Sequence, residues 1–137
     1  YIPTRGDNEE KSAELFLEYV KTLNNAKIDH KLDEKTVEFV RDVILHTKNH
    51  TQKNPKIEGD NTAQLFLDMD LSILGAEAEQ YKEYSKNIRL EYIHYPIDAF
   101  KAGRKKILQT FVDTSAPLFR TAEFQERFGK KAIENLQ

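Results

Sequence analysis

The chain has 137 residues, a length that suits one domain with a sizeable apolar core. It has no cysteine, which excludes disulfides, zinc–thiolate sites and thiol nucleophiles. Its net charge of −2, with both signs interspersed, argues against broad nucleic-acid binding. The sequence shows no signal-peptide pattern and no long apolar run, so we expect a soluble, cytoplasmic protein that does not bind membranes.

Helical periodicity dominates the first half of the chain. Asp7 with Glu10 predicts a capped helix start, and Asp33 predicts the cap of a second helix. The polar stretch from His50 to Asp60 contains a proline and a glycine and predicts a loop. Helical periodicity also dominates the second half of the chain.

We expect a third helix from about 61 to 74 that stops at Gly75, and a fourth from about 77 to 95 that ends before Pro96. A fifth carries Phe100 and Phe111, and a short final helix begins near Ala122. No alternating strand pattern is present. The sequence therefore predicts one compact all-α bundle over residues 1–137.

One acid falls inside an apolar stripe of the third helix. Asp70 lies three residues after Leu67 and just before Leu71, whereas Asp68 is predicted to point elsewhere, because residues two apart do not share a helix face. A carboxylate aimed at a core must be paired or must hold a metal. Asp70 is therefore a candidate metal ligand.

Other polar groups also project onto apolar faces. His50 follows the second helix, Arg104 lies within the stripe of the fifth, and Arg89 borders the tyrosine face of the fourth. Imidazole with carboxylate suits a divalent Mn, Fe, Co, Ni or Zn ion, and nearby arginines suit phosphate. The same pattern is equally typical of a structural ion pair between Asp70 and Arg104, with tyrosines that only pack.

Six segments occur in a characteristic order along the chain, namely Asp7–Ala13, Thr47–His50, Phe66–Gly75, Ile88–Tyr92, Gly103–Arg104 and Leu118–Phe124. The most specific part is the Asp-Met-Asp-Leu-Ser-Ile-Leu-Gly block at 68–75. Together these segments resemble a known family, the predicted metal-dependent phosphohydrolases of the HD superfamily. The resemblance covers nearly the whole chain and implies an HD-like helical fold.

In that superfamily a histidine, an adjacent His-Asp pair and a later aspartate surround one or two metals. Asp70 matches the later aspartate, and His50 matches an additional histidine of many members. The chain has no His-Asp dipeptide. In the family that pair precedes the segment matching residues 1–13, so we expect a chain that lacks its N-terminal helices; a natural variant without the pair is the alternative.

The resemblance implies hydrolysis of a phosphate ester or nucleotide by water on a divalent metal (Mn, Mg, Fe, Co, Ni or Zn). Lys48, Arg89, Tyr92 and Arg104 would bind this small phosphorylated substrate. Glu9 or Glu10 would position the water. Lys48 has an alternative role at a helix C-terminus, and Glu10 in capping.

Two rival functions stay open beside the enzyme. One is a non-catalytic ligand-binding or regulatory HD-like domain, and the other is a purely structural helical module.

Overall fold

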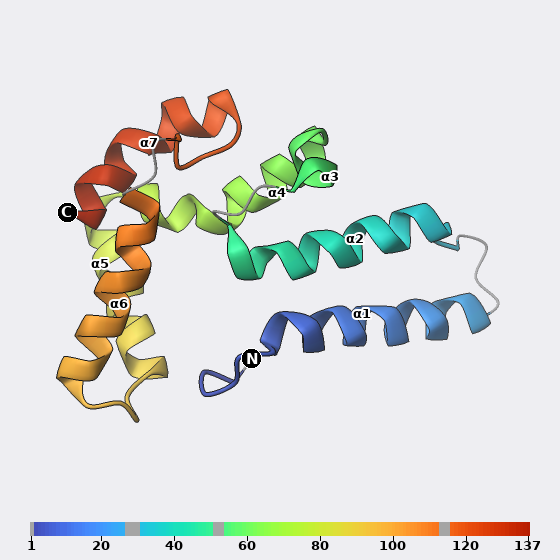
Figure 1. Cartoon of the computed structure of the whole chain (residues 1–137), viewed down its shortest axis with the longest axis horizontal. Helices are drawn as coiled ribbons and strands as arrows, with labels where there is room; N and C mark the ends of the chain where they lie inside the picture. Colours follow the sequence, from blue (N-terminus) through green and yellow to red (C-terminus); the bar gives the residue numbers. More distant parts are fainter. Residues whose placement is uncertain (1, 27–30, 51–53, 113–115) are drawn as a thin grey trace. The chain divides into compact units, whose positions relative to one another are not determined.

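The computed structural model describes residues 2–26, 31–50, 54–112 and 116–137. These residues form helices and connecting segments, with no β-strand among them, which confirms the all-α class (Figure 1). The elements in chain order are α1 (Asn8–Asn25), α2 (Glu34–His46), the 3₁₀ helix η1 (Thr47–Asn49), α3 (Pro55–Glu58), α4 (Asn61–Leu71), the 3₁₀ helix η2 (Ser72–Gly75), α5 (Ala78–Glu91), α6 (Ile97–Val112) and α7 (Ala122–Leu136).

The chain divides into two compact units, Tyr1–Gln52 and Lys53–Gln137, where the sequence predicts one domain over 1–137. The first unit is a helical hairpin in which α1 and α2 lie side by side (Figure 1). Ala13 and Val20 are its buried residues on α1, and Val43 and His46 are those on α2. Small and β-branched side chains at the contact allow the two helices to approach closely.

Of the two predicted helix caps in this unit, one is confirmed and one is wrong. Asp33 caps α2 as predicted, since its Oδ1 accepts a hydrogen bond of 2.9 Å from the backbone N of Thr36. Asp7 stands at the N-cap of α1, but its side chain makes no capping bond. It accepts two bonds from Arg5, at 2.7 and 2.6 Å. The predicted capping partnership of Asp7 and Glu10 is therefore wrong.

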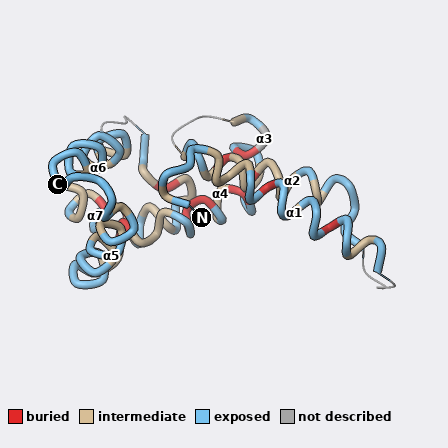
Figure 2. The backbone as a smooth tube through the Cα atoms, turned by 90° about the horizontal axis from the view of Figure 1, so that it is seen from below, coloured by how far each residue is buried: buried red, intermediate tan, exposed pale blue. Residues whose placement is uncertain are grey.

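The second unit is built around a small apolar core beneath α7. Leu74, Phe119 and Ala132 are buried there. Figure 2 colours buried residues red and shows exposed residues over most of the helices. Partly buried side chains pack around the buried core residues, namely Leu71, Tyr81, Tyr84, Phe111, Leu118, Phe124, Phe128 and Leu136. The core thus joins α4, η2, α5, α6 and α7, and it holds α5 and α6, which carry the candidate substrate residues Arg89 and Arg104.

Gly75 lets η2 approach α7 closely. A Cβ built on it would lie 2.6 Å from both the backbone oxygen and the Cβ of Phe128. No described glycine has a positive φ, so Gly75 is not the left-handed helix cap that its place after an apolar run suggests. It is required because backbone meets backbone at this point.

The observed helices differ from the predicted ones in three places. The predicted loop from His50 to Asp60 contains the short helix α3. Helix α5 ends at Glu91, earlier than the predicted 95. The final helix begins at Ala122 as predicted but extends over 15 residues, so it is not short. Thr121 starts α7 by accepting a bond from the backbone N of Phe124 at 3.4 Å.

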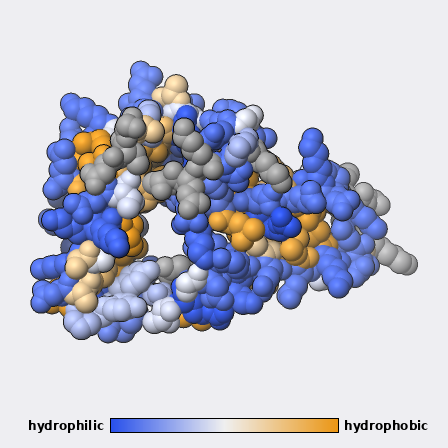
Figure 3. Space-filling model, in the orientation of Figure 1, coloured by the Kyte–Doolittle hydropathy of each residue, from blue (hydrophilic) through white to orange (hydrophobic). Residues whose placement is uncertain are grey.

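Within the described part of the chain, no helix is both long enough and apolar enough to cross a bilayer. Hydrophilic residues cover most of the face in Figure 3, with apolar side chains between them. Leu15 and Tyr19 on α1 are among the exposed apolar residues, at 67% and 61% exposure.

Candidate functional site

The two neighbouring acids of α4 have the opposite burial to the predicted one. Asp68 is buried, with 1% of its surface exposed, and Asp70 is exposed. The prediction that Asp70 faces the interior and Asp68 points away is therefore wrong. The role of Asp70 as a metal ligand stays a prediction.

Helix periodicity explains why the sequence pattern favours Asp70. At about 100° per residue, Leu71 lies about +40° and Leu74 about −20° from Leu67, whereas Asp70 lies at about −60° and Asp68 at about +100°. Asp70 is therefore nearer to the apolar stripe than Asp68, and periodicity alone favours the wrong acid. Only the neighbouring chain segments can determine which edge is covered.

The segment before α7 covers Asp68. Its Oδ1 accepts a hydrogen bond from the backbone N of Arg120 at 2.7 Å, and its Oδ2 accepts from the backbone N and the hydroxyl of Thr121 at 2.8 and 2.6 Å. These donors stabilise the buried carboxylate, which makes Asp68 a structural anchor for the start of α7. No signal in the sequence pairs Asp68 with Thr121.

The two predicted metal ligands belong to different units. His50 lies in the first and is partly buried, one turn after the buried His46. Asp70 lies in the second. The described residues contain no group of three or more histidine, aspartate or glutamate side chains that could hold a metal ion. The described donor set is therefore too small for a transition-metal site, and the shared site stays a prediction.

Glu10 and Lys48, predicted for catalysis and substrate binding, bind each other. The Nζ of Lys48 lies 2.5 Å from Oε1 of Glu10 and donates to the backbone oxygen of Gly6 at 2.6 Å. The hydrogen bond between Glu10 and Lys48 lowers the pKa of Glu10 and raises the pKa of Lys48 from their ordinary values. Glu9 adds electrostatic attraction for Lys48. The arrangement joins the start of α1 to η1.

Arg104, on α6, contacts the tyrosine face of α5. Its Nη2 donates to the hydroxyl oxygen of Tyr84 at 3.1 Å, and its guanidinium lies 5.6 Å from the centre of the Tyr84 ring. The side chain is partly buried. A cation over an aromatic face is attracted to the ring, so Tyr84 fixes the direction of Arg104. The predicted meeting of Arg104 with Asp70 and His50 stays a prediction.

Arg89 closes the end of α5. It donates to the backbone oxygens of Tyr92 at 2.7 Å and Tyr95 at 3.2 Å, and its guanidinium lies 5.0 Å from the centre of the Phe100 ring. These carbonyls follow the last helical turn, where backbone acceptors lack helical partners. Arg89 thus stabilises the turn between α5 and α6, which explains why α5 stops before 95.

Two predicted substrate residues, Tyr92 and Arg104, line one cavity of about 230 Å³ between α5 and α6. Tyr95 and Phe100 also line it, and the Tyr92 ring centre lies 6.2 Å from those of both. Its remaining lining residues are Ile88, Ala99, Gly103 and Ile107. The cavity therefore combines aromatic walls with one guanidinium, and we call it the aromatic cavity.

Tyr95 and Phe100 are not among the site residues that the sequence predicts. The aromatic residues on both sides of Pro96 were the signal available, since a tight turn brings such residues together.

No protein-family model matches the chain, and comparisons with curated proteins and with solved structures gave no match.

Proposed function

We propose that this chain binds a phosphate ester with an aromatic group, such as a nucleotide, as part of a metal-dependent phosphohydrolase. The observation that carries the proposal is the aromatic cavity, which is lined by both Tyr92, just after α5, and Arg104, on α6. The family resemblance of the sequence supplies the reaction, and the cavity supports the choice of substrate class.

The chemistry of Arg104 supports phosphate binding. One of its five N–H donors is used on Tyr84, and a guanidinium can present others to two oxygens of one phosphate. Partial burial strengthens that interaction because less water competes for the donors. The rings of Tyr92 and Phe100 offer flat apolar surfaces for a base or another aromatic leaving group.

The metal enters this proposal only through the resemblance. A divalent ion would supply an activated water, but the described residues do not fit such an ion by themselves, so no step of hydrolysis is assigned to them. Binding and orienting the ester are the tasks of this chain's own residues in the proposal. Glu9, Glu10 and Lys48 keep their predicted roles only as hypotheses, since Lys48 and Glu10 pair with each other.

Binding is tested by calorimetric titration of the chain with adenosine monophosphate. Arg104→Lys keeps the charge but loses bidentate geometry, so we expect about tenfold weaker binding, equal to about 1.4 kcal/mol. Arg127→Lys is the matched control, because Arg127 is an exposed arginine of α7 that does not line the cavity. Unchanged affinity in Arg104→Lys would overturn the substrate role.

Hydrolysis is tested by a phosphatase screen of the protein with Mn²⁺, Mg²⁺, Co²⁺, Ni²⁺, Fe²⁺ and Zn²⁺. Metal-dependent release of phosphate, lost in Arg104→Lys, supports the enzyme. Tight binding without hydrolysis under every metal would instead establish the non-catalytic ligand-binding alternative. Activity that survives Asp70→Ala would remove Asp70 from the metal site.

A further inference from the structure

A second hollow, of about 490 Å³, adjoins the aromatic cavity and shares Phe100 and Arg104 with it. Lys101, Arg104 and Lys105 supply three cationic groups to this hollow. Its apolar side chains include Leu108, Val112 and Leu136. We call it the cationic hollow. Its volume falls in the range of small-molecule sites.

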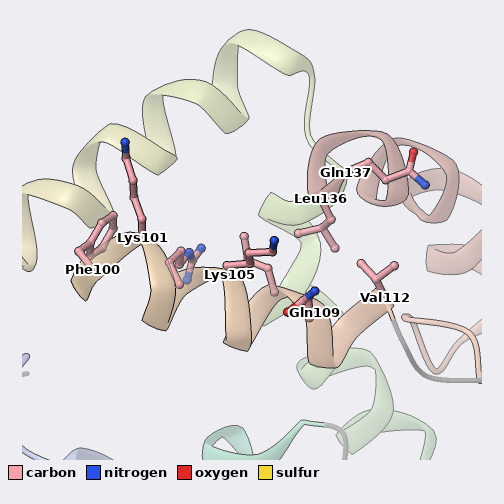
Figure 4. Close-up of a pocket in the computed structure, with 9 residues that line it drawn as sticks. Phe100, Lys101, Lys105, Gln109, Val112, Leu136 and Gln137 are labelled. Atoms are coloured by element: carbon pink, nitrogen blue, oxygen red, sulfur yellow. The ribbon is translucent and has the colours of Figure 1, made fainter. Parts of the chain in front are cut away.

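The cationic side follows from helical spacing. Lys101, Arg104, Lys105 and Leu108 are separated by three and four residues, so they share one side of α6. Figure 4 shows Lys101, Lys105 and Gln109 along α6, with Leu136 from the end of α7 beside its last turn. The hollow therefore combines three cationic groups with apolar side chains, of which Val112 and Leu136 lie at the end of α6 away from Lys101 (Figure 4).

Within the described part of the chain, these cations have no acidic partner. No aspartate or glutamate lines the hollow, and neither Lys101 nor Lys105 forms an ion pair there. Like charges four residues apart on a helix repel each other. A bound anion would relieve this repulsion and would be attracted by all three cations.

We propose that the cationic hollow binds a phosphate group carried on an apolar chain or ring. Arg104 and the two lysines hold the phosphate, and Leu108, Val112 and Leu136 contact the apolar part. This inference goes beyond the proposed function, because Lys101 and Lys105 do not line the aromatic cavity. A soluble phosphate ester and the headgroup of an anionic lipid share this chemistry.

The first test compares hexyl phosphate with methyl phosphate by calorimetry. Both carry the same charged group, so the apolar contact should make hexyl phosphate bind at least about fivefold tighter. Equal affinities would overturn the role of the apolar side. No binding of hexyl phosphate, together with no binding of vesicles, would overturn the proposal as a whole.

The second test removes the lysines. The double variant Lys101→Gln/Lys105→Gln should bind hexyl phosphate at least about fivefold more weakly, with a smaller dependence on salt. Lys82→Gln/Lys106→Gln makes the same change in net charge at exposed lysines of α5 and α6 that do not line the hollow. Equal losses in both double variants would show non-specific attraction and overturn the site.

Vesicles of phosphatidylcholine with phosphatidic acid distinguish the two sources of phosphate. Binding of these vesicles, lost in Lys101→Gln/Lys105→Gln, together with no affinity for hexyl phosphate, would identify a lipid headgroup. Binding of hexyl phosphate alone would identify a soluble ester. Tyr92→Ala should weaken adenosine monophosphate and leave hexyl phosphate unchanged, so this proposal and the proposed function can fail separately.

Discussion

Asp68 and Thr121, 53 positions apart, are joined by two hydrogen bonds through one carboxylate oxygen. Oδ2 of Asp68 accepts from the backbone N of Thr121 at 2.8 Å and from its hydroxyl at 2.6 Å. Thr121 is also the N-cap of α7. The contact therefore fixes the point at which α7 starts relative to α4, and the core of the second unit depends on that position.

Asp68→Ala should destabilise the second unit by about 3 kcal/mol. The change leaves the backbone N–H groups of Arg120 and Thr121 without their carboxylate partner in a buried place, and each such loss costs about 1–3 kcal/mol. Urea unfolding followed by circular dichroism measures the change. Glu126→Ala is the control at an exposed acid of α7 and should stay within about 0.5 kcal/mol. An equal loss in Glu126→Ala would contradict the anchoring role of Asp68.

Gly75→Ala should also destabilise the second unit, by about 1–3 kcal/mol, because a Cβ there meets the backbone of Phe128 and cannot be accommodated by a rotamer change. Gly103→Ala is the matched control within α6, where a Cβ would meet nothing within 4 Å. It should raise stability by about 0.5–1 kcal/mol through helix propensity. Opposite shifts in thermal midpoint are the expected result, and equal shifts would refute the close approach.

Tyr84→Phe should weaken binding of adenosine monophosphate about threefold. Without the Tyr84 hydroxyl, Arg104 loses the hydrogen bond that holds its guanidinium in position. The ring of residue 84 and its core packing stay in place. Tyr81→Phe is the control, since Tyr81 packs on the same core and its ring contacts Tyr84 but does not bind Arg104. Calorimetric affinities that change equally in both variants would remove Tyr84 from this positioning role.

The Glu10–Lys48 pair predicts how stability of the first unit depends on pH. The pKa of Glu10 is lowered by the Lys48 hydrogen bond, so its contribution is present above the ordinary glutamate pKa and is lost as pH falls through the lowered one. The pKa of Lys48 is raised, so the pair is also lost as pH rises through that raised value. Glu10→Gln should therefore lower stability at neutral pH.

Urea unfolding measures the difference in stability between Glu10→Gln and the unchanged chain. This difference should disappear at both low and high pH. Glu9→Gln makes the same charge change beside it and lacks the direct bond to Lys48. The same pH profile in both variants would show that general charge, and not the pair, is responsible.

The sequence by itself determined the helical class and several helix starts. Apolar spacing is a local property of the chain, and Asp33 caps a helix through contacts three residues away. Of the four predicted substrate residues, Tyr92 and Arg104 line one cavity and Lys48 and Arg89 do not, and the substrate role itself stays a prediction. The predicted end of α5 was less accurate, because Arg89 donates to carbonyl oxygens beyond the helix and so stabilises a turn there.

Only the tertiary structure decided which acid of α4 is buried. Local periodicity places Asp70 nearer to the apolar stripe than Asp68, so it favours the wrong acid. The choice depends on the segment at Arg120 and Thr121, more than fifty residues away, whose donors stabilise Asp68. Likewise, the sequence predicts that Gly75 ends a helix, whereas the structure requires glycine there because the backbone of Phe128 leaves no room for a Cβ. Contacts between distant segments leave no periodic signal in the chain, and these contacts fix the burial of polar groups.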